Sequence, residues 1–288
     1  FAGSAAAPAS RPVGWLFVVF LCAGPGLVPV AFVPLRAFCG LVSVALLMRA
    51  TDLLGEKTPR PLSVRLAHSL SVADLRLAAR VEPTFNAKLL ADGLARAAIG
   101  SLALWFACTT PPALEPATVA VRLFLGVIGF YLAFEGIDRT AQALYLLGGM
   151  RIEATQNSPI LSKTLAEFWG QRWNRIVHRW LAETAFAPFA RRCPKFGLLL
   201  AFVLSAGIHL MIVMPALGGW GAVAMGGFFV MHGLLVMAER FLRVGRWPVA
   251  WARIWTLLWI ILTTPLFLEP FLGLSGYPWM LDAVRAGA

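Results

Sequence analysis

Long apolar runs alternate along the chain with polar stretches, and most of the runs are long enough to form a membrane-spanning helix. Such a helix needs about 20 mostly apolar residues. Seven runs are candidates: 14–33, 35–50, 94–112, 118–148, 196–217, 220–240 and 251–272. Two polar stretches, 51–93 and 151–195, are predicted to be cytoplasmic or interfacial. The pattern predicts one all-α integral membrane domain over residues 1–288 with about seven transmembrane helices, or roughly six to nine, because amphipathic interfacial helices mimic spans.

The basic residues divide unevenly between the two sides of the membrane that this arrangement creates. With the N-terminus in the cytoplasm, the cytoplasmic segments are the leader, 49–96, 151–195 and 240–253, and they hold 21 of the 25 lysines and arginines. Because cytoplasmic loops are enriched in Lys and Arg, the asymmetry predicts this orientation. Residues 1–12 are expected to be a flexible leader, and the apolar run after them is expected to be a span and not a cleaved signal.

The composition favours a membrane protein and argues against other classes. Hydrophobic residues make up 59% of the chain and charged residues 14%, whereas a soluble domain carries about a quarter charged residues. The net charge of +11 comes from the segments between spans, which favours a topology signal over nucleic-acid binding. The four cysteines are widely spaced, so neither a disulfide framework nor a metal site is predicted. The abundance of Ala and Arg hints at a bacterial inner membrane; a eukaryotic chain would lie in the endoplasmic reticulum.

The second polar stretch contains an amphipathic helical pattern. Thr164 and Glu167 have the spacing of a capping box, which begins a helix. Apolar residues then recur at helical spacing: Leu165, Phe168, Trp169, Trp173, Ile176, Val177, Trp180 and Leu181. One interpretation is a helix lying on the membrane surface. The other is a helix that dips into the bundle, so that Asn174 and His178 face a site.

Two histidines lie within predicted spans, where an ionisable side chain is costly and is a candidate for function. His209 lies one turn after Ser205, and a buried neutral imidazole can accept a proton as a general base. The alternative is a packing histidine bonded to Ser205 or to a backbone carbonyl. His232 lies beside several glycines, with Glu239 two turns further on the same face, and is expected to be structural or to line a pocket.

The fourth predicted span carries a polar stripe on one helix face, formed by Glu135, Asp138, Arg139 and Gln142. Glu135 and Arg139 have the spacing of an ion pair along the helix. The stripe is expected to be a buried polar lock, with a proton or ion path as the rival interpretation.

Three short segments occur in a characteristic order: FWGQRWNRIVHRW at 168–180, LSAGIHL at 204–210 and FFVMHGLLVMAER at 228–240. The first is similar to the FWGRRWN-type segment of the membrane-bound O-acyltransferases, especially the wax synthase-like branch, and also to the sterol and diacylglycerol acyltransferase branch. The second resembles the family's histidine-bearing span, and the third resembles the wax synthase segment that follows it. The closing WTLLWIILTTPLFLEPF also fits, so that the resemblance covers about 158–272.

The resemblance implies a bundle with an internal tunnel, and an enzyme that moves an acyl group from a thioester, usually acyl-CoA, to a hydroxyl. It implies that His209 is the catalytic histidine and Asn174 the second active-site residue. The side chains expected to line the pocket or bind acyl-CoA are Trp169, Arg172, Trp173, His178, Trp180, Ser205, His232 and Glu239. Gln171 stands where the branch often has Arg, and no carboxylate follows His209, which bears on substrate preference.

The implied chemistry suits these residue types. His209 would take the proton of the attacking hydroxyl, which is worth about 10²–10⁴ in rate. The Asn174 amide would donate to the developing oxyanion or orient the nucleophile, and one oxyanion donor is worth about 3 kcal/mol. Direct transfer without an acyl-enzyme is expected, with acyl-CoA as co-substrate and no other cofactor or metal. CoA would approach from the basic cytoplasmic side and the acceptor from the lipid.

The acceptor favoured by the resemblance is a long-chain alcohol, which would make a wax ester; another lipid or a specialised metabolite is the alternative. Two other classes stay open. A membrane transporter would use the polar stripe of the fourth span, although the internal repeats common in transporters are absent. A protein of the same fold could also have lost catalysis and serve in lipid binding or assembly.

Overall fold

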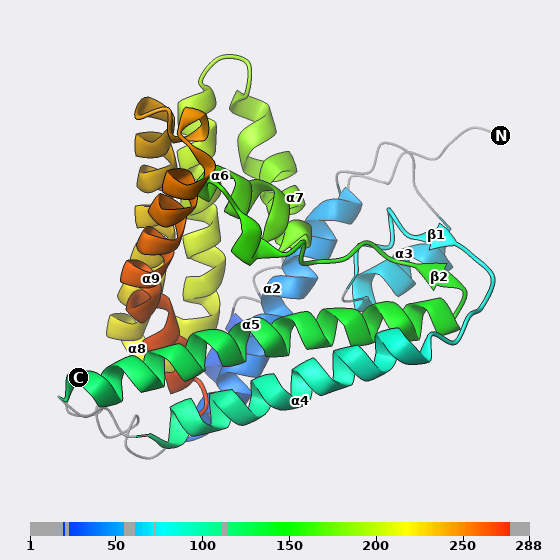
Figure 1. Ribbon diagram of the computed structural model, residues 1–288. Helices are drawn as coiled ribbons and strands as arrows, with labels where there is room; N and C mark the ends of the chain where they lie inside the picture. The colour runs from blue at the N-terminus through cyan, green and yellow to red at the C-terminus, as the bar shows by residue number, and fades with distance from the viewer. Residues whose placement is uncertain (1–19, 21–22, 55–60, 72, 111–114, 277–288) are drawn as a thin grey trace.

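The computed structural model describes residues 20, 23–54, 61–71, 73–110 and 115–276, which form an almost entirely helical molecule (Figure 1). The α-helices among them are α2 (Val33–Leu54), α3 (Leu62–Leu70), α4 (Ala87–Thr109), α5 (Pro116–Leu147), α6 (Leu165–Glu167), α7 (Arg175–Leu181), α8 (Pro194–Phe241) and α9 (Val249–Gly273). Short 3-10 or π turns are η1 (Gly24–Leu27), η2 (Pro159–Leu161), η3 (Phe168–Arg172), η4 (Ala182–Phe186), η5 (Ala187–Phe189) and η6 (Val244–Arg246). Two short strands, β1 (Ala79–Arg80) and β2 (Met150–Arg151), pair antiparallel with Ala79 opposite Arg151. The predicted all-α fold class is confirmed apart from this short ladder.

Five helices, α2, α4, α5, α8 and α9, are long and apolar enough to cross a membrane, so the described chain is a multi-pass membrane protein. They coincide with the predicted spans from 35–50 onward. The predicted leader 1–12 lies outside the described residues, as do 14–19 and 21–22 of the predicted span 14–33. The described stretch 23–32 of that span is the short turn η1 followed by irregular chain and not a continuous helix. The predicted cytoplasmic side of the N-terminus stays a prediction.

Helix α8 contains two of the predicted spans, 196–217 and 220–240, because it is bent at Gly218. This residue has φ 78°, a left-handed backbone conformation that glycine adopts without a steric penalty. The two arms pack against each other in antiparallel fashion: a Cβ built on Gly226 would lie 2.6 Å from Leu210, and one built on Gly233 would lie 2.9 Å from Phe202. The bend therefore brings residues about 30 positions apart into contact.

The first polar stretch is shorter than predicted, because helices enter it from both sides. Helix α2 continues to Leu54, and α4 begins at Ala87, whereas the predicted span began at 94. The Asn86 side chain accepts a hydrogen bond from Leu89 N at 3.0 Å, so a local cap sets this start. Between them, α3 is amphipathic, with exposed Leu62, Leu66 and Leu70 opposite a buried His68.

Helices α4 and α5 lie side by side along one edge of the molecule, and small residues allow their backbones to touch (Figure 1). A Cβ built on Gly100 would lie 2.3 Å from Ala133 N, and one built on Gly136 would lie 2.3 Å from Ala97 N. Small residues at such positions are typical of helix pairs in membranes, where close backbone approach supplies the packing energy.

Replacing Gly136 by alanine is expected to lower stability, because the added methyl group has to push two helix backbones apart. Overpacking of this kind costs about 1–3 kcal/mol. Gly227→Ala is the matched control, because a Cβ there meets nothing within 4 Å. Thermal unfolding in detergent should show a lower Tm for Gly136→Ala and an unchanged or higher Tm for Gly227→Ala. Equal Tm values would contradict the contact.

The polar stripe of α5 is a cross-helix lock, and the predicted pairing within it is wrong. Glu135 pairs with Arg96 of α4 at 2.7 Å, and Arg139 pairs with Asp92 of α4 at 2.8 Å. The charged side chains of α5 pair with α4 and not with each other, because α4 packs along this face and carries both an arginine and an aspartate. Asp138 instead accepts hydrogen bonds from Gln142 and from the backbone N–H of Thr155. These bonds support the polar lock over an ion path.

Candidate active site

The segment 164–181 is two helices and not the single amphipathic helix predicted. Thr164 Oγ1 accepts from Glu167 N at 3.0 Å, which confirms the predicted helix start, although the return bond to Glu167 comes from Lys163 N. After α6 the chain widens into the π turn η3, and the helix stops at Trp173. Asn174 has φ 39° and ψ 62° and begins α7. Asn is one of the few residue types that accept this left-handed conformation.

This broken segment packs among α2, α5 and α8, which supports the interpretation that it dips into the bundle (Figure 1). Trp180 is 4% exposed, and its Nε1 donates to Thr51 Oγ1 of α2 at 2.7 Å. Trp173 stacks on Phe168 with ring centroids 5.6 Å apart. It also contacts the rings of Phe130 and Phe134 of α5 at 5.7 and 5.9 Å.

Asn174 is held in place by its backbone and by one end of its side chain. Its N–H donates to Gln156 Oε1 at 3.3 Å, and Arg175 N donates to Thr155 O at 2.9 Å. Its Oδ1 accepts from Val177 N at 3.4 Å as the cap of α7. Its Nδ2 donates to no other described residue. The amide therefore keeps a donor available for a ligand.

His209 lies in the first arm of α8 with one ring nitrogen bonded to the backbone. Its Nδ1 lies 2.7 Å from the carbonyl oxygen of Ser205. Because a carbonyl only accepts, Nδ1 must carry a proton, and in the neutral ring Nε2 therefore has a lone pair. No described residue bonds to Nε2. The predicted contact with a carbonyl is present, yet it leaves the other nitrogen able to accept a proton.

Aromatic rings connect His209 to the broken segment. Phe229, on the second arm of α8, stacks on the His209 ring with centroids 4.0 Å apart, and Trp169 lies 5.7 Å from Phe229. On the other side, Phe267 of α9 contacts His209 at 6.4 Å and Phe130 at 5.2 Å, and Phe130 contacts Trp173. No hydrogen bond among the described residues joins His209 directly to Asn174. The rings thus run from His209 to Trp173, the residue that precedes Asn174.

The sequence did not identify the phenylalanines at 130, 229 and 267 as neighbours of the site. Phe229 lies 20 residues from His209 in the chain, and the only available signal was the glycine-containing gap between two apolar runs. That gap indicated two helices but not which faces of them meet.

His232 and Glu239 both bond to the broken segment from the second arm of α8. Trp169 Nε1 donates to His232 Nδ1 at 2.9 Å, and His232 Nε2 lies 2.8 Å from Thr263 Oγ1. The Glu239 carboxylate accepts from Leu165 N at 2.6 Å and Ala166 N at 3.2 Å, at the start of α6. Negative charge at a helix N-terminus is stabilising. Both side chains are buried, and the structural role predicted for His232 fits these bonds.

Two further residues predicted to line the pocket, Arg172 and His178, have different surroundings. Arg172 pairs with Glu167 at 2.7 Å and also donates to Asn157 O, so its charge is already neutralised. Burial would raise the pKa of Glu167, but the bonds from Lys163 N and Arg172 outweigh it and lower the pKa. Burial, together with the adjacent Arg179, lowers the pKa of the predicted pocket residue His178.

A hollow among the described residues has mostly basic charged residues in its lining, with Glu183 as the acidic member. This open hollow of about 550 Å³ beside the start of α8 is lined by Arg179, Arg191 and Arg192 together with Phe186 and Pro188. Within the described part of the chain, no cluster of His, Cys, Asp and Glu could hold a metal ion.

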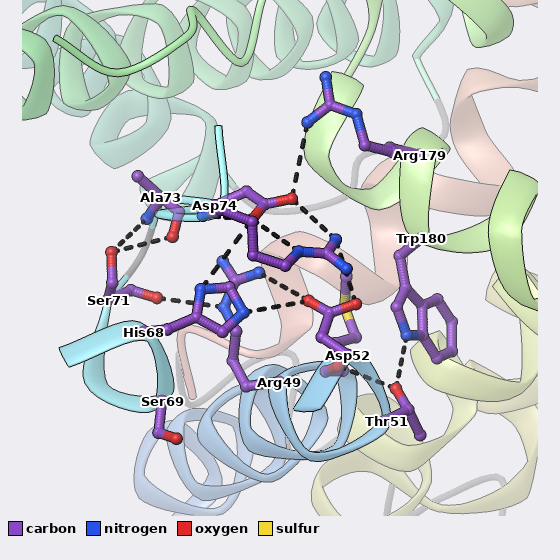
Figure 2. Close-up of polar contacts among 12 residues, drawn as sticks. Arg49, Thr51, Asp52, His68, Ser69, Ser71, Ala73, Asp74, Arg179 and Trp180 are labelled. Carbon is purple, nitrogen blue, oxygen red and sulfur yellow. Dashed lines mark hydrogen bonds and ion pairs between the residues drawn. The ribbon is translucent and has the colours of Figure 1, made fainter. Parts of the chain in front are cut away.

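A buried charge cluster, defined by Asp52, His68, Asp74, Arg76 and Arg179, supports α7 from the side of α2 and α3 (Figure 2). His68 Nε2 lies 3.3 Å from Asp52 Oδ2, and Arg76 bridges Asp52 and Asp74. Arg179 of α7 reaches Asp74 at 3.6 Å. Burial would raise the pKa of Asp74, but its hydrogen bonds and ion pair with Arg76 outweigh burial and lower the pKa to about 2. The same pair raises the pKa of Arg76.

The lowered pKa of Asp74 predicts a stability loss in acid. The folded state holds the carboxylate ionised, so its contribution is complete above the ordinary pKa of 3.8 and disappears as the pH falls toward about 2. At neutral pH, Asp74→Asn is expected to cost about 1–3 kcal/mol, because charged hydrogen bonds are lost. Thermal unfolding of both proteins between about pH 6 and pH 3 should show the difference in Tm shrinking as the pH falls toward the lowered pKa. A difference that does not change with pH would contradict the assignment.

Comparisons with known proteins identify sequences that this chain resembles. Residues 152–231 match the Membrane bound O-acyl transferase family. A probable long-chain-alcohol O-fatty-acyltransferase of Arabidopsis thaliana is 25% identical over 170 residues, which are 53% of this chain and 50% of that protein. An acyl-CoA–sterol O-acyltransferase of the same plant is 31% identical over 166 residues, 52% of this chain and 48% of that protein.

A third relative, a long-chain-alcohol O-fatty-acyltransferase of Simmondsia chinensis, is 29% identical over 121 residues, 38% of this chain and 34% of that protein. The chain spans about half the length of the two Arabidopsis relatives. The matched region contains both the FWGQRWN segment and His209. Over residues 152–231 the chain is thus similar to the membrane-bound O-acyltransferase family, as its motifs predicted.

Proposed function

We propose that this protein transfers a fatty acyl group from a thioester donor, acyl-CoA, to the hydroxyl of a lipophilic acceptor. The observation that carries the proposal is the state of His209: its Nδ1 proton is committed to the Ser205 carbonyl, and Nε2 has no partner among the described residues. A neutral imidazole held in this way is ready to accept a proton and has its orientation set in advance.

The reaction proceeds in one transfer. The acceptor hydroxyl gives its proton to His209 Nε2 while its oxygen attacks the thioester carbonyl. Asn174 Nδ2 donates a hydrogen bond to the oxyanion that forms. Collapse of this intermediate breaks the carbon–sulfur bond, and the departing thiolate takes the proton back from Nε2. The ester and the free thiol leave, and no acyl-enzyme is formed.

The acceptor that we propose is a long-chain alcohol, and the product is a wax ester. The support is the set of matched relatives whose names specify long-chain alcohols. The apolar rings around His209 suit a hydrocarbon chain, although they would also suit a flat sterol. The sterol acyltransferase among the relatives makes a sterol the alternative acceptor.

A direct test is thioester turnover by the purified full chain in nanodiscs. Acyl-CoA is supplied with one acceptor at a time: a long-chain alcohol, a sterol or a diacylglycerol. We expect release of free CoA together with an ester identified by mass spectrometry, and the highest rate with the long-chain alcohol. An ester made only from the sterol would show that a sterol, and not a long-chain alcohol, is the acceptor. Absence of any ester would contradict the proposed function.

A further inference from the structure

The two histidines of α8 are different tautomers, and their hydrogen bonds fix which ring nitrogen carries the proton in each. The indole Nε1–H of Trp169 can only donate, so His232 Nδ1, at 2.9 Å, must accept and carries no proton. A neutral His232 therefore carries its proton on Nε2 and donates it to Thr263 Oγ1 at 2.8 Å. Thr263 donates in turn to the carbonyl of Trp259 at 2.7 Å. In His209 it is Nδ1 that carries the proton.

These hydrogen bonds leave His232 with no ring nitrogen available for catalysis or ligand binding. Its side chain is fully buried, and both ring nitrogens have partners. A second proton on the ring would remove the acceptor of the Trp169 N–H and leave a buried donor without a partner, which is costly. His232 is therefore neither a base nor a ligand-binding group, although it lies only one turn from Phe229 of the ring chain.

The partner of His232 leads directly to His209. The indole of Trp169 packs edge-on against His232 and contacts Phe229, with centroids 5.3 and 5.7 Å apart. Phe229 stacks on His209 at 4.0 Å. The orientation of Trp169 thus decides where the Phe229 ring can lie, and the Phe229 ring limits how His209 can turn.

We propose that His232 is a positioning residue: held between Trp169 and Thr263, it fixes the Trp169 indole, which holds Phe229 against the base His209. This inference rests on the proposed function. Glu239 supports the same segment two turns further along the arm, but it bonds only the backbone at the start of α6. His232 instead bonds the indole of Trp169, and this indole contacts Phe229, the ring that stacks on His209.

The test compares a replacement that removes both bonds of His232 with one that keeps an acceptor for Trp169. His232→Phe keeps a ring and removes both bonds, whereas His232→Asn keeps an acceptor near the position of Nδ1 for Trp169. We expect kcat of His232→Phe to fall about 10- to 100-fold with little change in KM, because misplacement of a catalytic group costs rate. His232→Asn should recover part of this loss. In both variants the pH profile of kcat should keep its midpoint, since the base is unchanged.

Two further variants show whether the effect runs through this chain of bonds. Thr263→Val removes the partner of His232 Nε2 and should lower kcat, whereas Thr264→Val removes only a bond to Ile260 O and should leave kcat unchanged. Combining Trp169→Phe with His232→Phe should cost no more than the worse single change, because both break the same link.

The outcomes separate this inference from the proposed function. Wild-type kcat in folded His232→Phe would overturn the inference, as would a shifted pH midpoint or fully additive losses. If His209→Asn remains active while His232→Phe is inactive, the proposed base is wrong. Loss of activity in His209→Asn together with full activity in His232→Phe would refute the positioning role alone.

Discussion

Replacing His209 by asparagine is expected to abolish ester formation while the protein remains folded in the membrane. Asparagine can place an amide N–H where Nδ1 now donates to Ser205 O, so the packing contact is kept. It has no basic nitrogen at the position of Nε2. The change therefore removes the proton acceptor and little else, and loss of general-base assistance is worth about 10²–10⁴ in rate.

The measurement is single-turnover ester formation with saturating acyl-CoA and alcohol, together with the Tm of each protein. His209→Ala serves as a comparison, because it removes both the base and the packing bond. Both variants should be inactive, and asparagine should retain the higher Tm. If His209→Asn were as active as the wild type, His209 would be a packing histidine, and the mechanism would be wrong.

Replacing Asn174 by aspartate is expected to lower kcat about 10²–10³-fold, the usual cost of removing one oxyanion donor. Aspartate keeps an oxygen that can accept from Val177 N, tolerates the left-handed backbone and places negative charge at the start of α7. The helix start is therefore preserved. What disappears is the Nδ2 donor, and the new charge repels the oxyanion.

Asn174→Ala and Asn174→Gly separate the remaining contributions. Alanine loses the cap, which costs about 1 kcal/mol, and it also strains the positive φ. Glycine relieves the strain but supplies no amide. All three variants should therefore be impaired in kcat, with alanine the least stable. Wild-type kcat in Asn174→Asp would show that the amide donor has no part in the reaction.

Local features of the structure were predictable from the sequence because their causes are local. A span needs only a sufficient apolar length, so helices α2, α4, α5 and α9 lie where hydropathy placed them. The start of α6 depends on two residues three positions apart, and the predicted Thr164 cap is present. The order of three short motifs was enough to indicate a family resemblance, because such motifs are read directly along the chain.

The pairing of charges and rings could not be predicted, because it depends on which helix faces meet. Glu135 had an acceptable partner in Arg139 four residues on, yet it bonds to Arg96, which only the packing of α4 against α5 brings near. The amphipathic pattern of the sequence continues through Asn174, but the helix breaks there, because Trp173 packs against α5 and Asn174 bonds to Gln156. Neither partner is within helical reach along the chain.

The sequence by itself determined that this protein is a helical membrane protein, which segments are long enough to span, and which residue types could remove a proton and bind an oxyanion. Only the tertiary structure decided how His209 and His232 differ. Both are histidines in the same bent helix with similar apolar neighbours. His209 bonds to the Ser205 carbonyl one turn earlier in its own helix, which is a local contact. Contacts with the broken segment and α9 place His232 between an indole and a hydroxyl. A hydrogen-bond partner sets which nitrogen holds the proton, and the partners of His232 are assigned by packing in three dimensions and not by position in the chain.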